Sequence, residues 1–188
     1  MYLAETIDSL IDSKKDKLIR RQWYSHLLRE LKNTFKNLKD TKFVIEKFDE
    51  FDNSMYSFTG FYDMHEDKKY IVLNLSRKHK KFEMNNKIFK DFKFLLSQVI
   101  QHESIHQTQW SFRPEYKDPV TVDFRDNGTG MSKKEERLYL SDVDEIDAYG
   151  HDIALEIKHH YPKTDPLKIL RYPYRYKKLT SFFIYNRA

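Results

Sequence analysis

The period of the apolar residues changes twice along this chain, and that change constrains the fold more than any other feature. Between residues 3 and 39, apolar residues recur at three- and four-residue steps, which is typical of a helix. The segments 42–48, 57–64 and 69–76 are instead short, aromatic and β-branched. From about Lys87 the helical step returns. This order predicts an α+β fold with an N-terminal helix, a small three-stranded antiparallel sheet and further helices.

The composition is that of a folded chain and excludes membrane, collagen-like and low-complexity proteins. Of 188 residues, 39% are hydrophobic and 34% are charged, with four Gly and five Pro. The first residues carry acids where a signal peptide carries bases, so we expect a cytoplasmic protein, in the host cytoplasm if a phage encodes it. Because the chain has no Cys, a zinc site would need His and carboxylate ligands.

Residues 101–110 read QHESIHQTQW and contain the spacing H-E-x-x-H. In an α-helix, residues i and i+4 project from one face about 6 Å apart, so His102 and His106 could share one tetrahedral ion. They also continue an apolar helical stripe made of Ile88, Phe92, Leu95 and Val99. Glu103 would lie off the axis joining the two ligands, near a metal-bound water. The alternative is a chance match in a packed helix.

A catalytic zinc ion usually has three protein ligands and one open position. The run after His106 lacks the Gly and His of the longer H-E-x-x-H-x-x-G-x-x-H pattern, so the third ligand would come from elsewhere. A helix predicted from about Asp142 to His160, with Ser141 as its N-cap and Asp144 at its third position, offers several acids.

The phase of that helix selects one of its acids. Its expected buried arc consists of Ile146, Tyr149, Ile153 and Ile157. Glu145 borders this arc, whereas Asp144 lies nearly opposite and Asp147 lies well outside it. We therefore predict Glu145 as the third ligand; the alternative is a solvated acid favoured by the helix dipole.

The segments HESIHQTQ and YLSDVDEIDAYGHD, with strands before them and a loop between them, resemble the gluzincin branch of H-E-x-x-H zinc metallopeptidases, in particular small phage and bacterial zincin-like proteins. The similarity covers residues from about 70 to 157. It implies a zincin-like fold, His102, His106 and Glu145 as Zn²⁺ ligands, and Glu103 as the catalytic carboxylate. Many gluzincins carry an acid four residues after the ligand Glu, where this chain has Tyr149.

These observations predict a zinc-dependent metallopeptidase that hydrolyses a protein or peptide substrate. Glu103 would take a proton from the attacking water. Tyr149 is a candidate oxyanion donor, although a packing role fits it equally. Asp152 could accept a hydrogen bond from a ligand imidazole. The strand at 69–76 is the expected edge for an extended peptide to pair with.

An alternative function is that of a basic nucleic-acid-associated or virion protein that retains a zincin scaffold with structural zinc. It rests on the net charge of +5, on the sequence pI of about 9.1, and on RYPYRYKK at 171–178, where bases alternate with aromatic residues. The alternative, without any nucleic-acid binding, is that 171–178 packs against the rest of the chain and extends its basic groups to solvent.

The length fits a single zincin-like domain over 1–188. We divide it into an N-terminal helical segment (1–40), which Asp12–Ser13 could split into two helices, a catalytic core (41–160) and a basic, aromatic C-terminal segment (161–188). Within the core, 111–137 is predicted to be irregular, as a connecting loop or a flap over the substrate.

A calcium loop within 111–137 is rejected. Its DFRDNGTG segment would place Arg125 and Lys134 at ligand positions, and both are unsuited to binding a cation.

Overall fold

The computed structural model describes residues 9–16, 24–36, 38–48, 56–76, 84–112 and 133–185. The chain divides into two compact units, Met1–Gln107 and Thr108–Ala188, and the boundary falls within helix α4 (Asn86–Phe112). The single domain with three segments stays a prediction.

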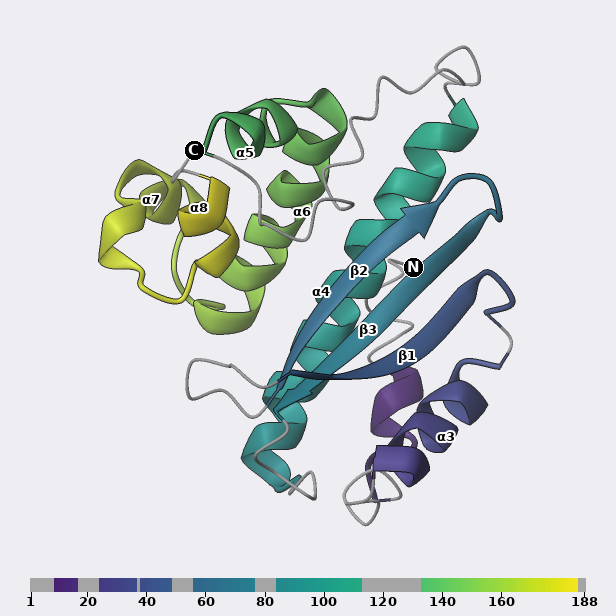
Figure 1. Cartoon of the computed structure of the whole chain (residues 1–188). Helices are drawn as coiled ribbons and strands as arrows, with labels where there is room; N and C mark the ends of the chain where they lie inside the picture. The colour runs from purple at the N-terminus through teal and green to yellow at the C-terminus, as the bar shows by residue number, and fades with distance from the viewer. Residues whose placement is uncertain are drawn as a thin grey trace. The chain divides into compact units, whose positions relative to one another are not determined.

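The first unit contains helix α3 (Tyr24–Thr34), three strands and most of α4 (Figure 1). The strands are β1 (Thr41–Phe48), β2 (Tyr56–Asp63) and β3 (Lys68–Ser76). Each strand begins within one residue of its predicted segment, so the α+β class is confirmed. Residues 9–12 are helical and a turn follows at 13–14, as the break at Asp12–Ser13 predicts.

The sheet is mixed, with the order β1-β3-β2, so the predicted antiparallel sheet is wrong. β3 pairs parallel with β1 and antiparallel with β2. β3 takes the centre because it is the most apolar strand, and a central strand buries its side chains most completely; Ile71, Leu73 and Leu75 have at most 1% of their surface exposed. The expectation that 69–76 forms a free edge for a peptide is therefore also wrong.

The antiparallel pair β2–β3 is fixed by its tight turn. The Oδ1 atom of Asp63 accepts hydrogen bonds from the backbone N–H groups of His65 and Glu66, at 2.9 and 3.1 Å. Asp67 completes the turn with a φ of 50°, in the left-handed region that Asp tolerates better than most residues.

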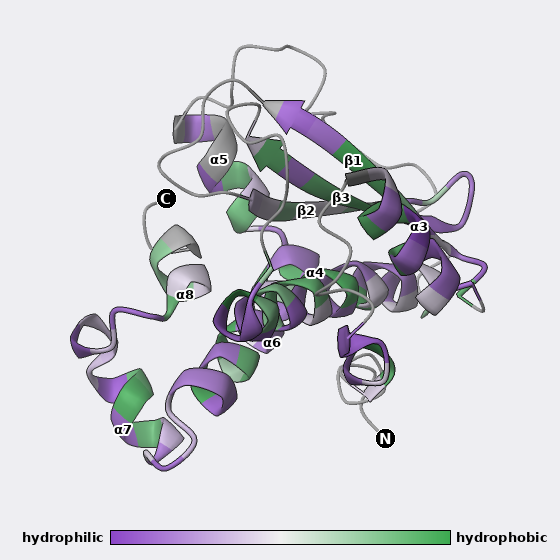
Figure 2. Ribbon diagram, turned by 90° about the horizontal axis from the view of Figure 1, so that it is seen from below, coloured by the Kyte–Doolittle hydropathy of each residue, from purple (hydrophilic) through white to green (hydrophobic). Residues whose placement is uncertain are grey.

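Helix α4 packs on the sheet and runs along β2. Apolar residues mark both β3 and α4 in Figure 2. The ring of Phe92 lies 5.7 Å from that of Tyr56 and 5.0 Å from that of Phe58, measured between centroids. The buried core of this unit consists of Ile11, Leu27, Leu31, Phe35, Phe43, Ile71, Leu73, Leu75, Met84, Phe89, Phe92, Leu96 and Ile100.

The buried face of α4 is one residue out of phase with the predicted stripe. Its buried line comprises Phe89, Phe92, Leu96, Ile100 and Glu103. The other members of the predicted stripe, including the two histidines, are half-buried and lie beside this line. The glutamate of the H-E-x-x-H motif is therefore the member that faces the core.

The second unit is helical in its described part. Its elements are α5 (Lys133–Leu140), α6 (Val143–His160), α7 (Pro166–Arg171), the short 3₁₀ helix η2 (Pro173–Arg175) and α8 (Thr180–Tyr185). The predicted irregular stretch 111–137 is too long, because α4 continues to Phe112 and α5 begins at Lys133. Residues 113–132, which include Arg125, lie outside the described residues, so the prediction of a connecting loop or a flap falls there as well.

The N-cap of α6 is Asp142, whose side chain accepts a hydrogen bond from the N–H of Asp144 at 2.8 Å. The predicted cap, Ser141, instead donates its hydroxyl to the carbonyl of Leu138 at 2.8 Å. An Asp oxygen caps as well as a Ser hydroxyl, so the helix begins one residue later than expected. Glu145, not Asp144, therefore occupies the third helical position.

The C-terminal segment packs against α6. Ile157, Ile169 and Leu179 form a small buried core. The carboxylate of Glu156, fully buried, accepts hydrogen bonds from the hydroxyl of Thr180 and from the backbone N–H and hydroxyl of Ser181, the latter two at 3.0 Å. This carboxylate thereby satisfies donors at the start of α8.

Across the ranges described, no helix combines the length and the apolarity that crossing a bilayer requires.

Candidate metal centre

His102 and His106 lie one turn apart on α4, within an unbroken helix of 27 residues. Their ring centroids are 4.9 Å apart and the ring planes meet at 71°. Both side chains are half-buried. The helix therefore presents two imidazoles side by side at the edge of its buried face, where both can approach one ion.

Glu103 is 4% exposed and lies against the edge strand β2. A β-carbon at Gly60 would stand 2.6 Å from its Oε1 atom and 2.8 Å from its Cγ atom. Such a separation is too short for non-bonded atoms, so the Glu103 side chain occupies space that only a glycine leaves open. A lone Gly inside a strand pattern is the sequence signal for such an approach.

A polar network holds the helical turn that follows the H-E-x-x-H motif. The Gln107 amide donates to Asp67 Oδ1 at 2.9 Å, and its oxygen accepts from Lys69 Nζ at 2.6 Å. Lys69, which is buried, also forms an ion pair with Asp40, and the hydroxyl of Tyr62 donates to Asp67 at 2.9 Å. These bonds anchor α4 to the end of the sheet. Sequence reasoning did not identify them, because their members lie far apart along the chain.

The network keeps its two carboxylates charged. Burial alone would raise the pKa of Asp40, but the hydrogen bond and charge of Lys69, together with Gln107, lower it below its ordinary value. Hydrogen bonds from Gln107 and Tyr62 lower the pKa of Asp67. Burial, followed by the hydrogen bond to Asp67, raises the pKa of Tyr62.

In the second unit, Glu145 is 8% exposed, whereas Asp144 is half-buried and Asp147 is exposed. Burial thus distinguishes Glu145 from the other two acids. The predicted arc is out of phase, however, because Ile146 is 44% exposed. The buried face of α6 comprises Glu145, Ala148, Asp152, Glu156 and Ile157.

This buried face is unusually acidic. Buried carboxylates are costly unless they are paired, hydrogen-bonded or bound to a metal. Glu156 has its partners in α8. Three acids and a small alanine thus occupy most of the buried face of α6, where the helical periodicity of the sequence predicts an apolar arc.

Gln109, in the last turn of α4, connects that turn to the first turn of α6 within the second unit. Its buried amide donates to the carbonyl of Asp144 at 3.1 Å and to Asp147 Oδ2 at 3.2 Å. These two residues stand on either side of Glu145. Asp147, which the helical phase rejects as a ligand, therefore accepts a hydrogen bond from Gln109.

The remaining predicted site residues also lie on α6. Tyr149 is half-buried, one turn after Glu145, and Asp152 is buried one turn further on. Their suggested roles, as oxyanion donor and as imidazole partner, stay predictions. His151, also on α6, is exposed, and its Nδ1 atom lies 3.0 Å from the carbonyl oxygen of Asp147.

Comparisons with protein-family models, with curated proteins and with solved structures found no match.

Proposed function

We propose that the chain is a zinc-dependent metallopeptidase in which His102, His106 and Glu145 bind Zn²⁺. Among the described residues, these three form a group of side chains that could hold a metal ion. Two imidazoles and one carboxylate are a donor set typical of catalytic zinc, which keeps one position open for water.

One observation carries the proposal. The two imidazoles stand side by side on α4, and Gln109, in the next turn of the same helix, donates hydrogen bonds to Asp144 and Asp147 in the first turn of α6. Because the imidazoles and Gln109 share one continuous helix, these hydrogen bonds support the choice of Glu145 as the third ligand. The burial of Glu145, against the greater exposure of Asp144 and Asp147, supports the same choice of ligand.

A bound Zn²⁺ would polarise the scissile carbonyl and lower the pKa of a coordinated water. Glu103 would accept a proton on its carboxylate from the attacking water and deliver it to the leaving nitrogen. Packing against Gly60 orients that carboxylate before substrate arrives, which reduces the reorganisation needed for proton transfer. Tyr149 is the candidate donor to the developing oxyanion.

An extended substrate would pair with β2 instead of β3. β2 is an edge strand, and its Gly60 contacts the carboxylate that would act as the base. Backbone hydrogen bonds to an edge strand hold a peptide in extended conformation irrespective of its sequence. The substrate class that fits is therefore an unfolded or flexible segment of protein.

The test is zinc content of the purified protein together with cleavage of an unfolded protein, with and without a chelator. We expect about one zinc per chain, cleavage that the chelator abolishes, and restoration by added zinc. Zinc that is present without any cleavage would reject the peptidase and favour a structural metal. Absence of zinc binding would reject the centre itself.

A second candidate function, nucleic-acid association through the C-terminal segment, is favoured by one observation. Tyr172 and Tyr174 are 47% and 66% exposed, and the guanidinium of Arg175 lies 5.0 Å from the ring centroid of Tyr172. Exposed aromatic rings beside bases suit stacking on unpaired nucleobases. Loss of oligonucleotide binding in Tyr172→Ala/Tyr174→Ala would support this function; unchanged binding would oppose it.

A further inference from the structure

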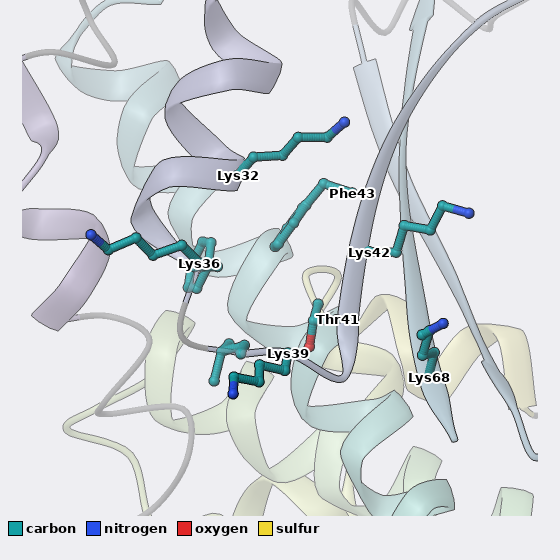
Figure 3. Close-up of a pocket in the computed structure, with 9 residues that line it drawn as sticks. Lys32, Lys36, Lys39, Thr41, Lys42, Phe43 and Lys68 are labelled. Carbon is teal, nitrogen blue, oxygen red and sulfur yellow. The ribbon is translucent and has the colours of Figure 1, made fainter. Parts of the chain in front are cut away.

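A pocket lined by lysines lies in the first unit, and none of the residues proposed to bind metal lines it. It has a volume of about 400 Å³ and is formed by α3, the turn after it and the starts of β1 and β3 (Figure 3). Its lining residues are Lys32, Phe35, Lys36, Leu38, Lys39, Thr41, Lys42, Phe43 and Lys68.

Acids compensate only part of this positive charge. Lys68 forms an ion pair with Glu66 at 3.0 Å. Asp40, the acid in the turn that lines the pocket, pairs with Lys69 and not with a lysine of the pocket. Within the described ranges, Lys32, Lys36, Lys39 and Lys42 form no ion pair with an acid. Four of the five ammonium groups therefore remain to attract an anion.

The lysines do not converge on one point. In Figure 3, the side chain of Lys36 extends away from those of Lys32, Lys42 and Lys68, and Lys39 extends in a further direction. A single small anion could reach only some of these ammonium groups. A chain of phosphates can reach several in succession, and lysine interacts with each phosphate as a point charge.

The pocket has no apolar anchor for a membrane. Phe35 and Phe43, which line it, are buried and stacked on each other, with centroids 5.1 Å apart. The large hydrophobic side chains that are exposed in the described chain all lie from Phe112 onward, in the second unit. Peripheral membrane binding generally combines bases with inserted apolar residues, which this face lacks.

We propose that this lysine pocket binds the phosphate backbone of a nucleic acid, without selecting among bases. It presents charge without exposed aromatic rings, so it offers backbone contacts and no stacking platform. The inference goes beyond the proposed peptidase and does not depend on it, because no proposed metal ligand lines the pocket.

The test compares two variants of the full chain that lose the same charge. The pocket variant is Lys32→Gln/Lys36→Gln/Lys39→Gln. The control is Lys87→Gln/Lys90→Gln/Lys134→Gln, three exposed lysines outside the pocket. Fluorescence anisotropy measures binding of a labelled oligonucleotide of about 20 nucleotides, single-stranded and duplex, across a salt series. Circular dichroism checks that both variants fold.

We expect the wild type and the control to bind with similar affinity at low salt, and the pocket variant to bind at least about tenfold more weakly. The slope of log affinity against log salt should fall by about 0.7 to 0.9 for each phosphate contact that is lost. Equal weakening in both variants would overturn the proposal, because only net charge would then matter.

Three further results would overturn it. The first is no binding of the oligonucleotide by the wild type at low salt. The second is displacement of the oligonucleotide by inorganic phosphate at matched ionic strength. The third is full binding by the pocket variant together with loss of oligonucleotide binding in Tyr172→Ala/Tyr174→Ala. Because peptidase activity is measured separately, failure of the metal centre leaves this test intact.

Discussion

Gly60 of β2 and Glu103 of α4 approach so closely that a β-carbon at position 60 would stand 2.6 Å from the Glu103 carboxylate. The two residues are 43 positions apart, and only the packing of the helix on the sheet brings them together. The absence of a side chain in the strand thus permits the position of the carboxylate that we propose as the base.

Gly60→Ala should therefore displace Glu103 and impair hydrolysis while leaving the metal bound. The methyl group cannot share the space of the carboxylate, so either the side chain or the strand must shift. We expect a fall of at least about tenfold in kcat/KM, measured on an unfolded substrate, with unchanged zinc content. Normal activity would show that the exact position of Glu103 does not matter.

The matched control is Gly150→Ala, because a β-carbon at position 150 meets no atom within 4 Å. Gly150 lies inside α6, where alanine is the better helix former. This substitution should stabilise the protein by about 0.5–1 kcal/mol and leave kcat/KM unchanged.

Glu103→Gln should retain zinc and lose hydrolysis, whereas His102→Ala or His106→Ala should lose both. Gln cannot take up the proton, but it fills the same space beside Gly60. Metal analysis and peptide cleavage distinguish the two outcomes. Cleavage that persists in Glu103→Gln would remove this residue from the role of base.

Glu145→Ala should weaken zinc binding by orders of magnitude, because it removes a ligand. Asp147→Ala is the comparison: its carboxylate accepts from Gln109 at 3.2 Å, so its loss should have a much smaller effect. Titration against a chromophoric chelator measures both affinities. A larger loss in Asp147→Ala would mean that the wrong acid was chosen.

Lys69→Met should destabilise the protein by about 1–3 kcal/mol, because Asp40 and Gln107 lose a buried partner. The pKa of Asp40 is lowered in the folded state from its ordinary value of 3.8. Its stabilising contribution is therefore complete above that value and is lost as the pH falls below it. Urea unfolding should show a difference between wild type and variant that is constant near neutral pH and shrinks in acid.

Asp40→Asn serves as the control for that pH dependence. Without a titrating group at position 40, the acid-dependent part of the Lys69→Met difference should be reduced. A difference that stays the same at every pH would assign the effect to packing of the lysine stem rather than to its charge.

Glu156→Gln should destabilise the second unit by about 1–3 kcal/mol, since a neutral amide replaces a buried acceptor of several hydrogen bonds. Combining it with Ser181→Ala in a double-mutant cycle should give less than the sum of the two losses, because the residues share these bonds. Thermal unfolding followed by circular dichroism measures the effect. Additive losses would contradict direct coupling.

The kind and the place of the helices and strands follow from the local amino-acid pattern. Strand starts agree within one residue, and the helical spacing of His102 and His106 follows from the motif, because both depend on residues close together in the chain. Glu145 is the most buried of the three acids considered, and Asp142, not Ser141, caps its helix; its role as a ligand stays a prediction.

The order of the strands, the phase of the buried faces and the contacts around the site depend on how the elements pack against each other. β3 is the most apolar segment, but the segments alone do not reveal that it lies between β1 and β2 or that it pairs parallel with β1. The approach of Gly60 to Glu103, the anchors at Gln107 and Gln109, and the partners of Glu156 all join residues distant in sequence. Local periodicity predicts which face of a helix is apolar, but the element that packs against the helix decides which side chains are buried.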